Sequence, residues 1–274
     1  MLATSIGKLS YHGMNIEVTG VFWFSRSSQS TASSCQSTFI SMGDLINFTT
    51  ADGNAARGYL ATPATGTGPG VLVIQEWWGL VDHIKEVCDR FAEAGWVALA
   101  PDLYDGREVP LDEPDEAAKA MMGMQLSRAA ADLDGAVDVL VARSAGHGVG
   151  VIGFCMGGGL ALVVGANRPD AVAAVVSCYG VLPWPEAHPD YTNLAAATLL
   201  QCAGEDDFFT PDAARALASR LEDLGKVVEL AIYDGAQHAF FNDDRPEVYD
   251  PTAAQALWER SLDFLSAHVG TSAG

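Results

Sequence analysis

Residues 149–159 constrain the fold more than any other part of this 274-residue chain. They read VGVIGFCMGGG, so an apolar, strand-like run leads into the pattern Gly-x-Cys-x-Gly and then into a helical pattern. A sharp strand-to-helix turn lifts its central side chain out of the sheet, and flanking glycines let neighbouring backbone pass without a Cβ clash. The pattern predicts a nucleophile elbow with Cys155 at its tip. The alternative is a structural cysteine, because free cysteine is often a small core residue.

A second motif overlaps the first, because residues 148–153 also match Gly-x-Gly-x-x-Gly. Dinucleotide binding requires these glycines after the strand, at the start of the helix, whereas here they lie before and within the strand. The chain also lacks His-Glu-x-x-His and a phosphate-binding P-loop. We therefore expect no cofactor and no catalytic metal.

Strand and helix patterns alternate along the chain after residue 42. Strands are expected at 44–49, 58–61, 71–75, 97–99, 149–152, 172–177, 198–202 and 227–232. Helices are expected at 82–95, 116–143 (as two helices), 158–166, 211–224 and 252–268. Such alternation predicts an α/β fold with a mostly parallel central sheet and helices on both faces.

The N-terminal part differs from the rest, since residues 25–41 are rich in Ser, Thr and Gln. Such a segment cannot bury enough apolar surface to order itself. We expect a disordered extension over residues 1–41 and a single α/β domain over residues 42–270.

The net charge and the cysteine content limit which partners the chain can bind and which compartment it is expected to occupy. The chain has 15 Lys plus Arg against 35 Asp plus Glu, and a net charge of −20 repels nucleic acid and anionic membranes. Its five cysteines include no Cys-x-x-Cys pair, which argues against a disulfide framework or a zinc site. No apolar run is long enough to cross a membrane. These features predict a cytoplasmic protein that acts on a small molecule, as a monomer or weak homo-oligomer.

A thiol nucleophile needs a base, and in a fold with this elbow the acid and then the histidine follow the nucleophile along the chain. His188, His238 and His268 qualify by position. His268 ends a helix, where it serves as a favourable C-terminal charge, and His188 lies in a loop without a supporting strand. His238 follows the strand at 227–232 and an Asp-Gly-Ala turn, so it is predicted to be the base. The acid should end the preceding strand, where spacing alone leaves Glu205, Asp206 and Asp207 open.

From about residue 42 to its last helix the chain resembles the dienelactone hydrolase family of α/β-hydrolases, also called carboxymethylenebutenolidases. Four stretches carry the resemblance: VIQEWWG at 73–79, APDLY at 100–104, GFCMG at 153–157 and DGAQHAF at 234–240. The resemblance implies a Cys155, Asp206 and His238 triad, because the family's acid follows Gly-x directly, with Asp207 as the alternative.

The resemblance also gives Glu76 a role, since the family's glutamate contacts the resting thiol and helps to activate it. A strand-end cap is the alternative for this residue. The backbone N–H groups of Trp77 and Met156 are predicted to form the oxyanion hole.

Substrate recognition is where the family pattern is incomplete. The family binds the carboxylate of dienelactone with two arginines, and Arg107 is a plausible counterpart of the first. The second belongs four residues after the histidine, where this chain has Asn242, and we expect Arg245 to reach the pocket only after a loop rearrangement. Neutral lactones or short-chain esters should therefore react better than dienelactone. The expected pocket lining, for which core packing is the alternative, is Trp77, Trp78, Tyr179, Phe240 and Phe241.

Together these features predict a hydrolase that cleaves small esters or lactones through a thioester on Cys155. Two other functions are weighed against it. A hydrolase of carbon–halogen or similar bonds on the same fold would be expected to carry aspartate at position 155. The other is a small-ligand-binding protein that retains a relic of the elbow.

Overall fold

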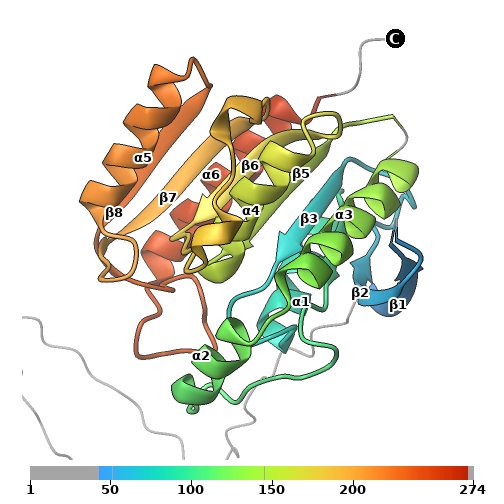
Figure 1. Cartoon of the computed structure of the whole chain (residues 1–274), viewed down its shortest axis with the longest axis horizontal. Coiled ribbons are helices and arrows are strands. Elements are labelled where there is room, and N and C mark those ends of the chain that lie inside the picture. The colour runs from blue at the N-terminus through green and yellow to red at the C-terminus, as the bar shows by residue number, and fades with distance from the viewer. Residues whose placement is uncertain (1–42, 51, 145, 271–274) are drawn as a thin grey trace, which may run out of the picture. The chain divides into compact units, whose positions relative to one another are not determined.

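The computed structural model describes residues 43–50, 52–144 and 146–270 (Figure 1). The extension predicted to be disordered, residues 1–41, lies outside the described residues. No helix within these ranges is both long enough and apolar enough to cross a bilayer.

A single sheet of eight strands forms the centre of the described domain, in the order β1-β2-β4-β3-β5-β6-β7-β8. The strands are β1 (Gly43–Thr49), β2 (Ala55–Ala61), β3 (Gly70–Ile74), β4 (Val97–Pro101), β5 (Val149–Phe154), β6 (Val172–Cys178), β7 (Ala197–Glu205) and β8 (Val228–Gln237). β2 is antiparallel to β1 and β4, and the other pairs are parallel. Parallel strands are covered on both faces, which explains the fully buried, apolar sequences of β3 and β5.

Helices cover both faces of the sheet (Figure 1). They are α1 (Asp82–Glu93), α2 (Pro114–Met122), α3 (Leu126–Arg143), α4 (Met156–Asn167), α5 (Pro211–Asp223) and α6 (Pro251–His268). α1 and α6 pack on the same face, where the Phe91 and Trp258 rings lie 4.7 Å apart. α3, α4 and α5 lie on the opposite face (Figure 1). The fold is an α/β-hydrolase fold, as the sequence predicts.

The observed elements differ from the predicted ones in two places. Two short 3-10 helices, η1 (Pro185–Ala187) and η2 (Tyr191–Asn193), lie in a segment expected to be a loop. The turn expected at Asp234-Gly235-Ala236 is wrong, because β8 continues through these residues to Gln237. The register with β7 shifts there, and Gly235 has a φ of +74°, so a bulge replaces the turn.

The parallel strands bring chemically important residues to one edge of the sheet. β3 ends two residues before Glu76, while β5, β7 and β8 end immediately before Cys155, Asp206 and His238. Carboxyl ends of parallel strands share one edge, where ligand sites of open α/β sheets form.

Candidate active site

Cys155 occupies the strained turn between β5 and α4. Its φ of +53° and ψ of −120° are rare for a residue with a side chain and cost on the order of 1–3 kcal/mol. The flanking glycines allow the turn to pack. A Cβ on Gly153 would lie 2.0 Å from the carbonyl oxygen of Gly157, and one on Gly157 would lie 2.3 Å from that of Ile74. The predicted elbow is therefore present, and it packs directly against the end of β3.

The predicted histidine and one of the three candidate acids are in contact. Nδ1 of His238 lies 2.7 Å from Oδ2 of Asp206. The other oxygen of Asp206 accepts hydrogen bonds from the backbone N–H groups of Phe208 and Phe209, at 2.8 and 3.0 Å. Asp206 is buried, whereas Glu205 and Asp207 are exposed. The geometry thus selects Asp206 as the partner of His238.

The contacts of His238 set its protonation. Burial lowers the pKa of His238, but its hydrogen bonds with Asp206 and Cys155, together with their negative charges, outweigh burial and raise the pKa to about 10. The imidazole is therefore protonated at neutral pH.

Glu76 is held by a residue that the sequence analysis did not assign to the site. The side chain of Asn242 donates a hydrogen bond from Nδ2 to Oε2 of Glu76, at 2.7 Å. Its own Oδ1 accepts from the backbone N–H of Asp244, at 3.1 Å. Glu76 and Asn242 are 1% and 0% exposed, so this is a buried contact. The signal available in the sequence was the position of Asn242, four residues after His238.

Two backbone N–H groups close in sequence to Glu76 and Cys155 have no backbone acceptor in the part of the chain that the structure describes and can donate hydrogen bonds to an oxyanion. Met156 is the first residue of α4, so its N–H has no partner within the helix, and the helix N-terminus favours negative charge. No backbone carbonyl among the described residues accepts a hydrogen bond from the N–H of Trp77. Trp77 follows Glu76 in the loop that packs against the elbow.

A cavity of about 360 Å³ opens onto Cys155 and His238. Its apolar walls include the two predicted tryptophans, Trp77 and Trp78. Glu76, Glu205 and Asp207 supply carboxylates, and Arg245 and the protonated His238 are the cationic side chains in the lining. The remaining lining residues are Pro114, Met121, Val181, Phe208, Gln237, Ala239 and Val248.

Two residues predicted to contact substrate lie elsewhere. Tyr179 and Phe240 are both 0% exposed and are absent from the cavity lining. The Tyr179 ring packs 5.2 Å from the His238 ring and 5.6 Å from that of Phe240. Tyr179 therefore packs against the histidine from the core side and Phe240 packs against Tyr179, so the core-packing alternative describes both better. Phe241 is likewise buried in the core.

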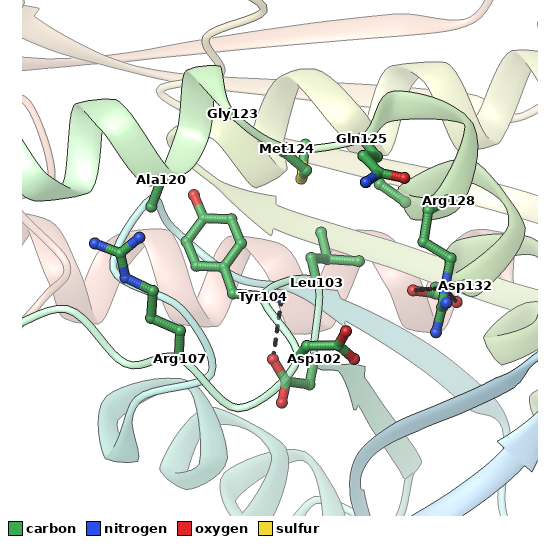
Figure 2. Close-up of a pocket in the computed structure, with 12 residues that line it drawn as sticks. Asp102, Leu103, Tyr104, Arg107, Ala120, Gly123, Met124, Gln125, Arg128 and Asp132 are labelled. Atoms are coloured by element: carbon green, nitrogen blue, oxygen red, sulfur yellow. Dashed lines mark hydrogen bonds and ion pairs between the residues drawn. The ribbon is translucent and has the colours of Figure 1, made fainter.

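Arg107 is also absent from the Cys155 cavity. It lines a separate, polar cavity of about 300 Å³, where it lies beside Tyr104 and Ala120 (Figure 2). Its guanidinium is paired with Glu116 at 3.1 Å. Arg128, in the same cavity, is paired with Asp132 at 2.8 Å. Arg107 follows the motif at residues 100–104 closely, which is why the sequence predicts that it contacts substrate. The sequence does not show which cavity its side chain enters.

Arg245 lines the catalytic cavity in this structure without any rearrangement of its loop. The expectation that only a loop rearrangement could bring Arg245 into the pocket is therefore wrong. Its guanidinium carbon lies 5.6 Å from the centre of the Trp78 ring. It also forms an ion pair with the exposed Glu247 at 2.9 Å. The stacked tryptophan keeps the arginine at the cavity wall.

The described residues include no cluster of three or more His, Cys, Asp or Glu side chains that could hold a metal ion.

Comparisons with known proteins show which family this chain resembles. Residues 56–269 match the model of the family described as "Dienelactone hydrolase family". "Protein usf" of Aquifex pyrophilus is 37% identical over 83% of this chain and 100% of its own length. "Putative carboxymethylenebutenolidase" of Aquifex aeolicus (strain VF5) is 34% identical over the same shares. The crystal structure of "Putative Dienelactone Hydrolase" from Klebsiella pneumoniae subsp. pneumoniae MGH 78578 superposes with a TM-score of 0.70 and 27% identity, covering 81% of this chain and 98% of that one.

Proposed function

This chain belongs to the dienelactone hydrolase family, and from that premise we propose that it hydrolyses small uncharged esters or lactones through a thioester on Cys155. One observation carries the proposal. Nδ1 of His238 lies 2.7 Å from Oδ2 of Asp206, and Cys155 and His238 line the same apolar cavity at the carboxyl ends of their strands. This is the arrangement that nucleophilic catalysis of acyl transfer needs.

The first half-reaction transfers the acyl group to the enzyme. The Cys155 thiolate attacks the carbonyl carbon, and the displaced electron pair moves onto the carbonyl oxygen. The N–H groups of Trp77 and Met156 donate hydrogen bonds to that oxyanion and stabilise it. The intermediate then collapses by breaking the bond to the leaving oxygen, which takes the proton of the His238 imidazolium. With a lactone, the alcohol produced remains attached to the acyl chain.

The second half-reaction returns the enzyme to its starting state. Neutral His238 takes a proton from water, and the hydroxide attacks the thioester carbon. The carbon–sulfur bond breaks, a carboxylic acid leaves, and Cys155 is again a thiolate beside a protonated His238. Asp206 keeps the imidazole in the orientation that both proton transfers require.

Glu76 acts as a second proton acceptor for the thiol. A carboxylate in the wall of the cavity can take the thiol proton when the resting cysteine is neutral. The bond from Asn242 to Oε2 fixes the carboxylate and leaves its other oxygen for this exchange.

The charges of the cavity favour uncharged substrates. Glu76, Glu205 and Asp207 oppose an anion, whereas the positive charges of Arg245 and His238 are already paired with Glu247 and Asp206. An arginine–carboxylate contact is worth about 1.5–3 kcal/mol per charged hydrogen bond. A site with one carboxylate-binding arginine instead of two should therefore bind an anionic substrate about 10- to 100-fold more weakly. Dienelactone is therefore a slow substrate, and neutral lactones and short-chain esters are faster.

Steady-state kinetics with dienelactone, a neutral lactone of similar size and p-nitrophenyl acetate test the proposal. Wild type should turn over all three, fastest on the neutral substrates, and Cys155→Ala should turn over none. Cys88→Ala, which alters a buried cysteine in α1, is the matched control and should remain active. Binding without turnover would identify a ligand-binding protein, and turnover of haloalkanoates alone would identify a carbon–halogen hydrolase.

A further inference from the structure

A second cavity adjoins the catalytic one between α4 and α5. Its volume is about 560 Å³, larger than the catalytic cavity of about 360 Å³. Val181 and Phe208 line both cavities, so the two share a wall. The second cavity has an apolar lining that includes Leu162, Leu182, Pro183, Phe209 and Leu217.

Phe208 is the prominent part of the shared wall. Its ring lies 4.9 Å from the His238 ring and 6.5 Å from that of Trp77. Its backbone is fixed, because its N–H donates to Asp206 at 2.8 Å, yet the residue is 65% exposed. A large exposed aromatic at the mouth of an active site leaves apolar surface in water that a bound ligand would cover.

The apolar part of the second cavity ends at a polar rim. The guanidinium of Arg220 lies 5.0 Å over the ring of Tyr191, and both residues line the cavity. His188 also belongs to the lining, and together with Tyr191 and Arg220 it limits the apolar surface that an alkyl chain can contact.

We propose that the second cavity binds the alcohol portion of an ester whose acyl portion occupies the catalytic cavity. The inference rests on the proposed function and extends it from small esters to esters of extended apolar alcohols. The leaving oxygen takes its proton from His238, so the group attached to that oxygen must lie beside His238 during acyl transfer. Phe208 packs on His238 and continues into the second cavity, and it therefore guides that group there.

Two ester series test this assignment. One series keeps the acetyl group and lengthens the alcohol from ethyl to hexyl, and the other keeps ethanol and lengthens the acid from acetyl to hexanoyl. Each methylene that becomes fully buried is worth about fourfold in kcat/KM. Wild type should gain along the alcohol series until the chain reaches the rim and then level off.

Filling the second cavity should remove that gain. Ala216 lines it from an exposed position on α5, so Ala216→Trp inserts a ring into the cavity without disturbing the core. We expect the preference for hexyl over ethyl acetate to fall at least about tenfold, the value of two buried methylenes. Ala213→Trp, exposed on the same helix and outside the cavity lining, should keep the wild-type preference. Melting temperatures of both variants verify that they fold.

The outcomes separate this inference from the proposed function. If Ala216→Trp changes the acyl series alone, or neither series, the assignment of the second cavity is wrong although the enzyme hydrolyses esters. If wild type hydrolyses no ester of either series, the proposed function fails and this inference fails with it.

Discussion

Replacing Asp206 with asparagine changes the chemistry of the site while keeping its shape. Asp206 receives hydrogen bonds from His238 at 2.7 Å and from the backbone N–H groups of Phe208 and Phe209 at 2.8 and 3.0 Å. The two backbone donors both point at Oδ1, so the carbonyl oxygen of asparagine should take that position. Its NH₂ group then faces Nδ1 of His238. Nδ1 must become the acceptor, so the ring hydrogen moves to Nε2. Nε2 then cannot take the proton from water that the second half-reaction requires.

The expected effect follows from this tautomer change. Loss of the orienting carboxylate in a triad of this type costs about 10⁴ in kcat, which corresponds to about 5.4 kcal/mol of transition-state stabilisation. The same change removes the partner that raises the pKa of His238, so the pKa should fall. The side-chain volume and the backbone hydrogen bonds are kept, so the variant should fold.

The assay is kcat for p-nitrophenyl acetate across pH, with Asp207→Asn as the matched control. Asp207 is exposed and has no hydrogen bond to His238, so its variant should stay within about twofold of wild type. An Asp206→Asn variant that loses less than about tenfold, or an Asp207→Asn variant that loses more, would refute this account of the acid.

Three further predictions test other parts of the site. The pKa of His238 is raised from 6.5 to about 10, so its contribution to stability is complete below pH 6.5 and is lost as pH rises through about 10. The melting temperature of wild type should fall over that range more than that of His238→Gln, and parallel curves would contradict the raised pKa. Asn242→Ala leaves the buried Glu76 carboxylate without its donor, so urea unfolding should show a loss of about 1–3 kcal/mol that shrinks when Glu76→Gln is added. An equal loss in both backgrounds would show that the Asn242–Glu76 hydrogen bond does not contribute to the free energy of unfolding. Arg245→Ala should lower kcat/KM for dienelactone about tenfold, whereas Arg107→Ala should change it less than twofold, because only Arg245 lines the catalytic cavity. The reverse order would restore Arg107 to the binding site.

The sequence predicted those parts of the fold that depend on local pattern. The apolar run before Gly153 and the glycine pair around Cys155 are sufficient to predict the elbow, because packing there leaves no room for a Cβ atom. The helical spacing of apolar residues predicted α1 and α6 closely. The order of nucleophile, acid and histidine restricted the base to three candidates, of which the structure places His238 beside the elbow.

The parts that sequence could not predict depend on side-chain direction. Asp206 and Asp207 are adjacent, and only the end of β7 decides which of them points at His238. Arg107 lies close in sequence to the predicted site, but its side chain lies beside Ala120 of α2 (Figure 2) and pairs with Glu116. In the sequence, Asn242 stands out only because it occupies the position of an expected arginine, since its contact with Glu76 joins residues 166 positions apart.

The most direct test of the central claim is to trap the acyl-enzyme. Wild type mixed with p-nitrophenyl acetate and quenched in acid within the first turnovers should gain the mass of one acetyl group. Peptide mapping should locate that group on Cys155, and hydroxylamine should remove it, as expected of a thioester. The Cys155→Ala variant should gain no mass under the same conditions. Turnover of the ester by this variant, or an acetyl group on another residue that forms and decays at the rate of turnover, would contradict the claim that Cys155 is the nucleophile.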